Sequence, residues 1–213
     1  MKKIISLFKR DYESTRQVYN EVVPGSDWVL AGEGVATVKY DGTCCLVRDG
    51  KLYRRYDRKL SKSANKRKRK DKSFAPGIEH FKPAPDGWEA AELEPNKHTG
   101  HWPGWLPVSE TNSQDQWHKE AWKQFDSDDG TYELVGPKVQ GNPYNLDVHK
   151  LIRHGEEVHA DNDPPRDFEG LKIWLEQFEV EGIVWHHPDG RMVKIKRRDF
   201  GLEWPVKTTF AAT

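Results

Sequence analysis

Long hydrophobic runs and spaced cysteines are both missing from this sequence. No stretch approaches the roughly 18 apolar residues of a membrane-spanning helix, and Lys9 and Arg10 interrupt the apolar start too soon for a signal-peptide core. The only cysteines, Cys44 and Cys45, are adjacent, so they cannot supply a disulfide framework or a zinc site. We therefore expect a protein of the reducing cytoplasm with no membrane partner.

An excess of charge of one sign is also missing. The 34 Lys and Arg residues balance the 34 Asp and Glu residues, so no global field marks the chain as a nucleic-acid binder. The charge is nevertheless uneven, because residues 58–72 (RKLSKSANKRKRKDK) form a basic low-complexity run. Such a run either contacts nucleic-acid phosphates or is a solvated, mobile loop, and the sequence leaves both interpretations open.

The length of 213 residues is enough for a sizeable core. We expect a single domain over residues 1–213, with a basic loop at about residues 58–72 and an insertion rich in Pro, Gly and Trp at about residues 73–125. The aromatic residues of this insertion either stack on bases or pack in a core. A mean hydropathy of −0.91 indicates a strongly hydrated surface.

Strand and helix patterns are mixed along the chain. Apolar and β-branched stretches predict strands at residues 4–8, 28–30, 131–137 and 148–153, and turn residues predict hairpins at 46–54 and 181–196. Aromatic and aliphatic residues at helical spacing predict helices over 114–125 and 167–178. Residues 12–22 read as a polar connection or a helix. The predicted class is α+β.

The most conspicuous chemistry is the pentapeptide KYDGT at residues 39–43. A strand delivers Lys39 to Asp41-Gly42, a strong hairpin-turn pair, and a second strand follows. A lysine in such a place is held rigidly, and its amine is a potential nucleophile. The alternative is a surface hairpin with an incidental lysine.

Other strands carry charged residues that suit a phosphorylated ligand. Glu133 lies among apolar neighbours, where a carboxylate is costly without a partner. Lys194 and Lys196 share one face of a strand and repel each other unless an anion lies between them. Arg54 and Arg55 point to opposite faces of their strand, and either arginine is a candidate for a phosphate contact.

These stretches, in this order, resemble the covalent nucleotidyltransferase superfamily of polynucleotide ligases and messenger-RNA capping enzymes. KYDG (39–42) is similar to its nucleotidyl-lysine motif and YELVG (132–136) to its central glutamate strand. EGIV (181–184) is similar to its metal-glutamate motif and VKIK (193–196) to its closing lysine motif. The version KYDGTCC, with DRK at 57–59, is most similar to compact RNA ligases related to the vertebrate 5′-to-3′ RNA ligase.

The resemblance implies an antiparallel-sheet nucleotidyltransferase domain of the ATP-grasp-like ligase adenylation type. About a dozen residues follow Phe200, so we expect no C-terminal OB domain, which capping enzymes and DNA ligases need. DNA ligases also usually carry an arginine where this chain has Cys44. A capping-type guanylyltransferase, a DNA ligase and a non-catalytic RNA-binding module remain the alternatives.

The activity implied is that of an ATP-dependent RNA ligase that forms AMP. It would use ATP with Mg²⁺, or Mn²⁺ in its place, to join 5′-phosphate and 3′-hydroxyl ends of RNA, and we expect a monomer with no protein partner. The resemblance implies a role for each matching residue: Lys39 as the nucleophile that carries AMP, Asp41 as the residue that orients the site near it, Lys194 and Lys196 as contacts to the α-phosphate, Glu181 as a metal-site residue acting through water, Glu133 as a ribose contact, and Arg55, with Arg54 left open, as a phosphate contact.

Overall fold

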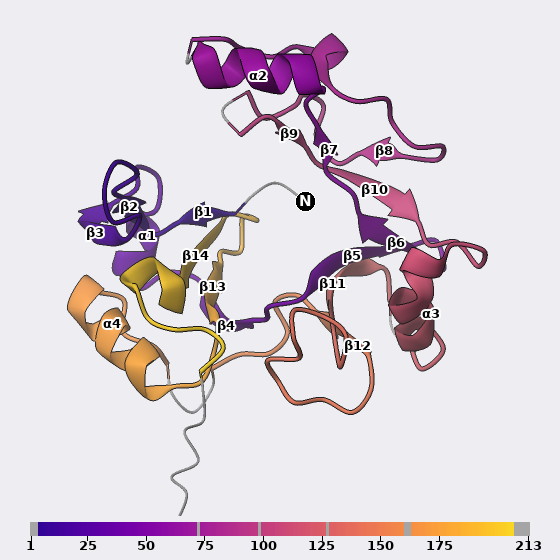
Figure 1. Cartoon of the computed structure of the whole chain (residues 1–213). Helices are drawn as coiled ribbons and strands as arrows, with labels where there is room; N and C mark the ends of the chain where they lie inside the picture. Colours follow the sequence, from indigo (N-terminus) through magenta and orange to yellow (C-terminus); the bar gives the residue numbers. More distant parts are fainter. Residues whose placement is uncertain (1–3, 72, 98, 127, 160–162, 207–213) are drawn as a thin grey trace, which may run out of the picture. The chain divides into compact units, whose positions relative to one another are not determined.

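Short helices and antiparallel sheets alternate in the computed structural model, which describes residues 4–71, 73–97, 99–126, 128–159 and 163–206 (Figure 1). The expected mixture of helices and antiparallel strands is confirmed. No helix in these ranges has the length and apolar character needed to cross a membrane. Within the described residues the chain divides into unit 1, residues 42–152, and unit 2, residues 4–41 and 153–206.

Unit 2 is built from one N-terminal stretch and one C-terminal stretch of the chain. Its elements are β1 (Ile5–Ser6), β2 (Phe8–Arg10), β3 (Val18–Val22), α1 (Asp27–Leu30), β4 (Val35–Lys39), α4 (Phe168–Gln177), β13 (Gly182–His186), β14 (Met192–Lys196) and the 3-10 helix η3 (Arg197–Phe200). A four-stranded sheet has the order β1-β14-β13-β4, in which only β1 and β14 are parallel. β2 and β3 form a separate antiparallel pair.

The helix predicted over residues 167–178 is confirmed as α4. The Asp167 side chain caps it by accepting a hydrogen bond from the Gly170 N–H at 2.8 Å. Leu171 and Leu175 are fully buried on one side of the helix, as its amphipathic spacing requires. They share a core with the inward residues of β13 and β14, namely Ile183, Trp185, Val193 and Ile195.

Unit 1 contains the remaining elements. They are β5 (Thr43–Arg48), β6 (Lys51–Arg55), β7 (Arg58–Lys59), α2 (Lys62–Lys70), η1 (Ile78–His80), β8 (Glu89–Ala90), β9 (His101–Trp102), β10 (Gly104–Pro107), η2 (Ser113–Asp115), α3 (Gln116–Trp122), β11 (Gly130–Val135) and β12 (Lys150–Arg153). Six strands form a sheet in the order β12-β11-β5-β6-β10-β8, and β7 pairs with β9. The predicted hairpin β5–β6 and strand β11 are confirmed.

One face of the six-stranded sheet is covered by α3, the helix predicted within residues 114–125. Directly opposite residues of antiparallel strands share a face, so Cys45 of β5 and Tyr132 of β11 lie on the α3 side. Both are buried in a core that includes Ala121 of the helix. We call this side of the sheet the α3 face; Cys44 and Glu133, which are also paired, lie on the opposite face.

A basic loop is expected at about residues 58–72, and this expectation is wrong. The run contains the helix α2. Ser61 caps the helix, its hydroxyl accepting from the Ala64 N–H at 3.3 Å. Ala64 is buried in a small core that the Trp-rich insertion provides, together with Leu60, Phe74, Phe81 and Trp102. Burial of one small residue and a cap thus order a segment whose composition alone indicated mobility. Lys72 lies outside the described residues.

The chain at Asp41-Gly42 does not form the predicted hairpin. β4 pairs with β13 in unit 2, whereas β5 pairs with β6 and β11 in unit 1, so the motif links two different sheets. Gly42 is needed here for packing, because a Cβ atom on it would collide with the Leu134 carbonyl oxygen.

Two other local predictions are wrong. Residues 28–30, predicted as a strand, lie in α1; its single turn buries the neighbours Trp28 and Val29 together, which an alternating strand could not do. Residues 18–22 form β3 rather than a polar connection or helix. The side chain of Asp11 accepts from the Ser14 and Thr15 N–H groups, and this turn brings β3 back to pair with β2.

Candidate functional site

Three predicted lysines share one face of the sheet in unit 2. Lys39, the last residue of β4, lies opposite Gly182, which in turn lies opposite Lys196. Lys194 is two residues before Lys196 on β14 and therefore points to the same face. The register of three strands thus gathers amines that are far apart in the sequence.

Gly182 explains why this face has room for lysines. A Cβ atom at this position would collide with the Ile195 carbonyl oxygen and approach the Lys196 Cα atom to 2.9 Å. A side chain on the central strand would therefore push β14 away. The glycine that follows Glu181 keeps Lys39 and Lys196 on strands that both pair tightly with β13.

Glu181 is a buried carboxylate in the middle of these cations. It forms an ion pair with Lys39, and its Oε1 atom lies 3.9 Å from the Lys196 Nζ atom. Burial raises the pKa of the Glu181 carboxyl, while the charge of Lys39 opposes this rise. The charge of Asp41 also acts on Glu181, and that of Asp199 acts on Lys194, so carboxylates accompany the three ammonium groups. Three ammonium groups gathered on one face suit a polyphosphate.

The pKa of Lys194 responds to its burial and to the charges around it. Burial, and after it the charges of Lys39 and Lys196, lower the pKa of Lys194 to about 8, although the charges of Glu181 and Asp199 act in the opposite direction. The repulsion that the sequence analysis inferred for the paired lysines is thus accompanied by burial. An anion beside Lys194 would favour its charged form.

Asp41 is held by a residue that sequence reasoning missed. The indole N–H of Trp204 donates a hydrogen bond to Asp41 Oδ2 at 3.0 Å, and Trp204 is itself buried. The Arg198 guanidinium donates to the Trp204 carbonyl oxygen at 2.6 Å, which fixes this segment on η3. The tryptophan itself, a large side chain near the end of the sequence, was the available signal.

In unit 1, the central glutamate contacts the glycine of the lysine motif. The Gly42 N–H donates to Glu133 Oε1 at 3.0 Å, which provides the partner that a carboxylate in an apolar strand needs. Because Gly42 packs closely against β11, the motif is fixed at this end by both shape and hydrogen bonding.

The two arginines of β6 have different surroundings. Arg54 lies opposite Cys45 on the α3 face, and its Nε atom is 2.7 Å from Oδ1 of the fully buried Asp115. Arg55 points to the opposite face, where Glu133 lies, and its Nε donates to Asp57 Oδ1 at 2.5 Å. Arg54 therefore serves the packing of α3, and Arg55 is the arginine that shares a face with Glu133.

Cys44 lies beside Glu133 on the same face. Burial, and after it the charge of Glu133, raises the pKa of the Cys44 thiol to about 12. Since the thiolate is the reactive form of cysteine, Cys44 is a poor nucleophile at neutral pH. Cys44 therefore does not compete with Lys39 for the role of nucleophile.

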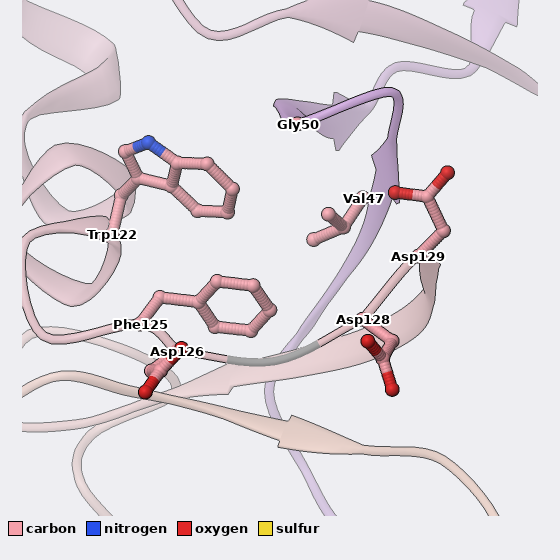
Figure 2. A pocket seen from close by; sticks show the side chains of 7 residues that line it. All are labelled: Val47, Gly50, Trp122, Phe125, Asp126, Asp128 and Asp129. Atoms are coloured by element: carbon pink, nitrogen blue, oxygen red, sulfur yellow. The ribbon is translucent and has the colours of Figure 1, made fainter.

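Figure 2 shows a pocket on the α3 face of unit 1. The Trp122 and Phe125 rings and the Val47 side chain line it, with three aspartates around them: Asp126, Asp128 and Asp129. None of the predicted site residues is among them. The acidic lining repels phosphate, so this pocket does not suit a nucleotide.

Comparison with known proteins gives a consistent result. A family model described as RNA ligase 1 matches residues 29–128 and 124–213. RNA ligase 1 of Danio rerio is 35% identical, with 96% of this chain and 79% of that protein covered. RNA ligase 1 of Pongo abelii is 35% identical and that of Rattus norvegicus 34% identical, each with 83% of this chain and 70% of the relative covered.

Proposed function

The chain belongs to the RNA ligase 1 family, and on this premise we propose that it is an ATP-dependent RNA ligase. It would join 5′-phosphate and 3′-hydroxyl RNA ends through a lysyl-AMP and an RNA-adenylate intermediate, on a nucleotidyltransferase fold. The observation that carries the proposal is the buried Glu181 carboxylate surrounded by Lys39, Lys194 and Lys196 on one sheet face.

In the first step, the Lys39 Nζ atom attacks the α-phosphorus of ATP. The N–P bond forms as the bond to the bridging oxygen breaks, pyrophosphate leaves, and the amine gives up a proton. The position of Lys39 at the end of a paired strand supports this role, because the backbone beneath it is fixed on β13. Asp41, fixed by Trp204, would orient the backbone near Lys39.

Lys194 and Lys196 would stabilise the negative charge that grows on the α-phosphate. Glu181 would hold Mg²⁺, through water, since Mg²⁺ retains much of its hydration shell. Bound Mg²⁺ would neutralise phosphate charge during the transfer. The donor set fits this role, because Glu181 is a buried carboxylate that must exchange an amine partner for another cation when Lys39 reacts.

Two residues of unit 1 would bind the rest of the nucleotide. Glu133 would accept from the ribose hydroxyls, and Arg55 would contact a phosphate. The choice of Arg55 over Arg54 is supported by the sheet face that Arg55 shares with Glu133 and by the buried partner of Arg54.

The second and third steps transfer AMP and seal the RNA. The 5′-phosphate of the RNA attacks the phosphorus of lysyl-AMP, the N–P bond breaks, and Lys39 regains its amine. The 3′-hydroxyl of the other end then attacks the 5′-phosphorus, which forms the phosphodiester and releases AMP. No oxidant or reductant is required.

The test is the intact mass of the protein after incubation with Mg²⁺ and either ATP or GTP, followed by peptide mapping of any adduct. We expect the gain of one AMP on Lys39 with ATP only. Lys39→Arg is the control, because it keeps the ion pair with Glu181 but removes the nucleophile; it should stay folded and form no adduct. A guanylate adduct would favour a capping-type enzyme, and no adduct in folded, unmodified protein would favour an RNA-binding module.

A further inference from the structure

The helix α2 and the segments that carry it form a second concentration of positive charge, in unit 1. No acidic residue occurs between Arg58 and Lys70, and like charges recur at i,i+4 spacing along the helix, as at Lys62, Lys66 and Lys70. Such pairs destabilise an isolated helix. The helix is therefore maintained by its Ser61 cap and by the burial of Ala64 rather than by its surface.

A pocket of about 430 Å³ lies beside this helix. α2 contributes Asn65, Lys68 and Arg69, whose spacing of three and four residues places them on one side of the helix. Lys59 of β7 and His101 of β9 are directly paired and so share the face that lines the pocket.

The pocket lining combines apolar and polar side chains. The buried side chains of Leu60 and Phe74 form part of the lining and belong to the small core under α2. Thr99 adds a hydroxyl to the lining and Lys97 a fourth basic side chain. The Lys68 ammonium donates to the Lys97 carbonyl oxygen at 2.6 Å, which connects the helix to the segment around Lys97.

The charge of this pocket has one sign. Four side chains carry positive charge, those of Lys59, Lys68, Arg69 and Lys97, and none of the described lining residues is acidic. Lys97 forms an exposed ion pair at 3.5 Å with Glu94, which does not line the pocket. Partial burial lowers the pKa of Lys68. In a protein with no net charge, four cations around one concave surface suit a polyanion.

We propose that this pocket binds backbone phosphates of the RNA substrate, at nucleotides other than those being joined. Its volume falls in the range that accommodates a nucleotide rather than a single ion. Ammonium and guanidinium groups suit the phosphates, and the Asn65 amide and Thr99 hydroxyl suit sugar hydroxyls. The proposal rests on the proposed function, because it takes RNA as the substrate that reaches the reactive residues.

The test compares two double variants of the full chain that each remove two positive charges. Lys59→Gln with Arg69→Gln alters the pocket; Lys66→Gln with Lys70→Gln alters α2 outside it and is the matched control. RNA binding is measured as the fluorescence anisotropy of a labelled single-stranded RNA with a 5′-phosphate, at several salt concentrations. Adduct formation with ATP is measured separately for both variants and reports on the proposed function alone.

We expect the pocket variant to bind RNA about tenfold more weakly than the unaltered protein, with a salt slope smaller by about 1.4, as for two lost phosphate contacts on a single strand. The control should stay within about threefold, and adduct formation should be unchanged in both. Equal losses in the two variants, or no loss in either, would overturn the proposal. Displacement of RNA by polyglutamate at equal charge concentration would overturn it in favour of an acidic protein partner.

Discussion

At the scale of single residues, the buried Glu181 has one observed partner and one proposed partner. It is the ion-pair partner of Lys39, and by proposal it holds Mg²⁺. Its neighbour Glu179 is exposed and two positions away in the sequence. Substitution of these two glutamates therefore compares a buried carboxylate at the lysine face with a solvated one nearby.

We expect Glu181→Ala to lower the rate of adenylylation by about tenfold or more and to raise the Mg²⁺ concentration needed for half-maximal rate. The rate of AMP transfer to Lys39 across a Mg²⁺ titration is the measurement. Glu179→Ala should behave as the unaltered protein. An unchanged Mg²⁺ dependence in Glu181→Ala would remove this residue from the metal site.

The two arginines of β6 should differ in the property that each supports. Arg54→Ala leaves the buried Asp115 without its ion-pair partner, so we expect it to lower the free energy of unfolding by about 3 kcal/mol. Arg55→Ala should change stability much less but weaken ATP binding. Urea unfolding and equilibrium ATP binding measure the two effects, and the reverse pattern would exchange the assigned roles.

This distinction also marks the limit of sequence reasoning at the residue scale. Alternation along the strand correctly placed Arg54 and Arg55 on opposite faces. It did not say which face is buried against α3, because the decisive partner of Arg54 is Asp115, 61 positions away as counted from the sequence numbers. Trp204 was missed for the same reason, since its hydrogen bond to Asp41 spans most of the chain.

At the scale of secondary-structure elements, the strongest patterns were predicted well. α3, α4 and the hairpin of β13 and β14 follow from aromatic and aliphatic residues at helical spacing and from turn residues, all of which are local. The predictions for the segments of α1 and α2 were wrong. The conformations of these segments depend on burial of Trp28, Val29 and Ala64 in cores made by distant segments. Local propensity was overridden by tertiary contacts at these elements.

The cap of α2 gives a prediction at this scale. Ser61→Ala removes the acceptor for the Ala64 N–H, so we expect the helix to lose about 1 kcal/mol of local stability. Amide hydrogen exchange in the first turn of α2 should become about fivefold faster, because a loss of about 1 kcal/mol raises the population of the open state by about that factor. Lys62→Ala, at an exposed position of the same turn, is the control. Equal exchange in both variants would show that the cap contributes nothing.

At the scale of the whole molecule, buried and partly buried histidines should make stability depend on pH. Burial lowers the pKa of His118, His159 and His186 below the usual 6.5. Between the folded and unfolded pKa values, the unfolded chain binds more protons than the folded chain. The stability that these neutral histidines contribute is therefore complete above about pH 6.5 and is lost as the pH falls below it.

His118 is the histidine to test. It is buried on α3 near Asp115, Arg54 and His149, and desolvation outweighs the attraction of Asp115. We expect the decrease in unfolding free energy between pH 7.5 and pH 5.5 to be smaller in His118→Gln than in the unaltered protein. Urea denaturation at the two pH values provides the comparison, and an identical decrease in both proteins would contradict the assignment.

The four motifs, taken in order, predict one shared site, but their order did not indicate how the chain divides. The boundary between the two units falls between Asp41 and Gly42, inside the lysine motif itself. Such a boundary depends on contacts between residues far apart in the chain, and a local turn pattern suggested a hairpin instead. The lysines and Glu181 belong to unit 2, whereas Arg55 and Glu133 belong to unit 1.

The two cysteines have a practical consequence for spectroscopy. Cys45 is fully buried, and the Cys44 thiol, with its pKa raised to about 12, remains protonated at neutral pH. Maleimides react with the thiolate, so neither native cysteine should take up a dye in the folded protein. A cysteine introduced at an exposed position such as Tyr12, which is 78% exposed, would then be labelled alone, with KYDGTCC left intact.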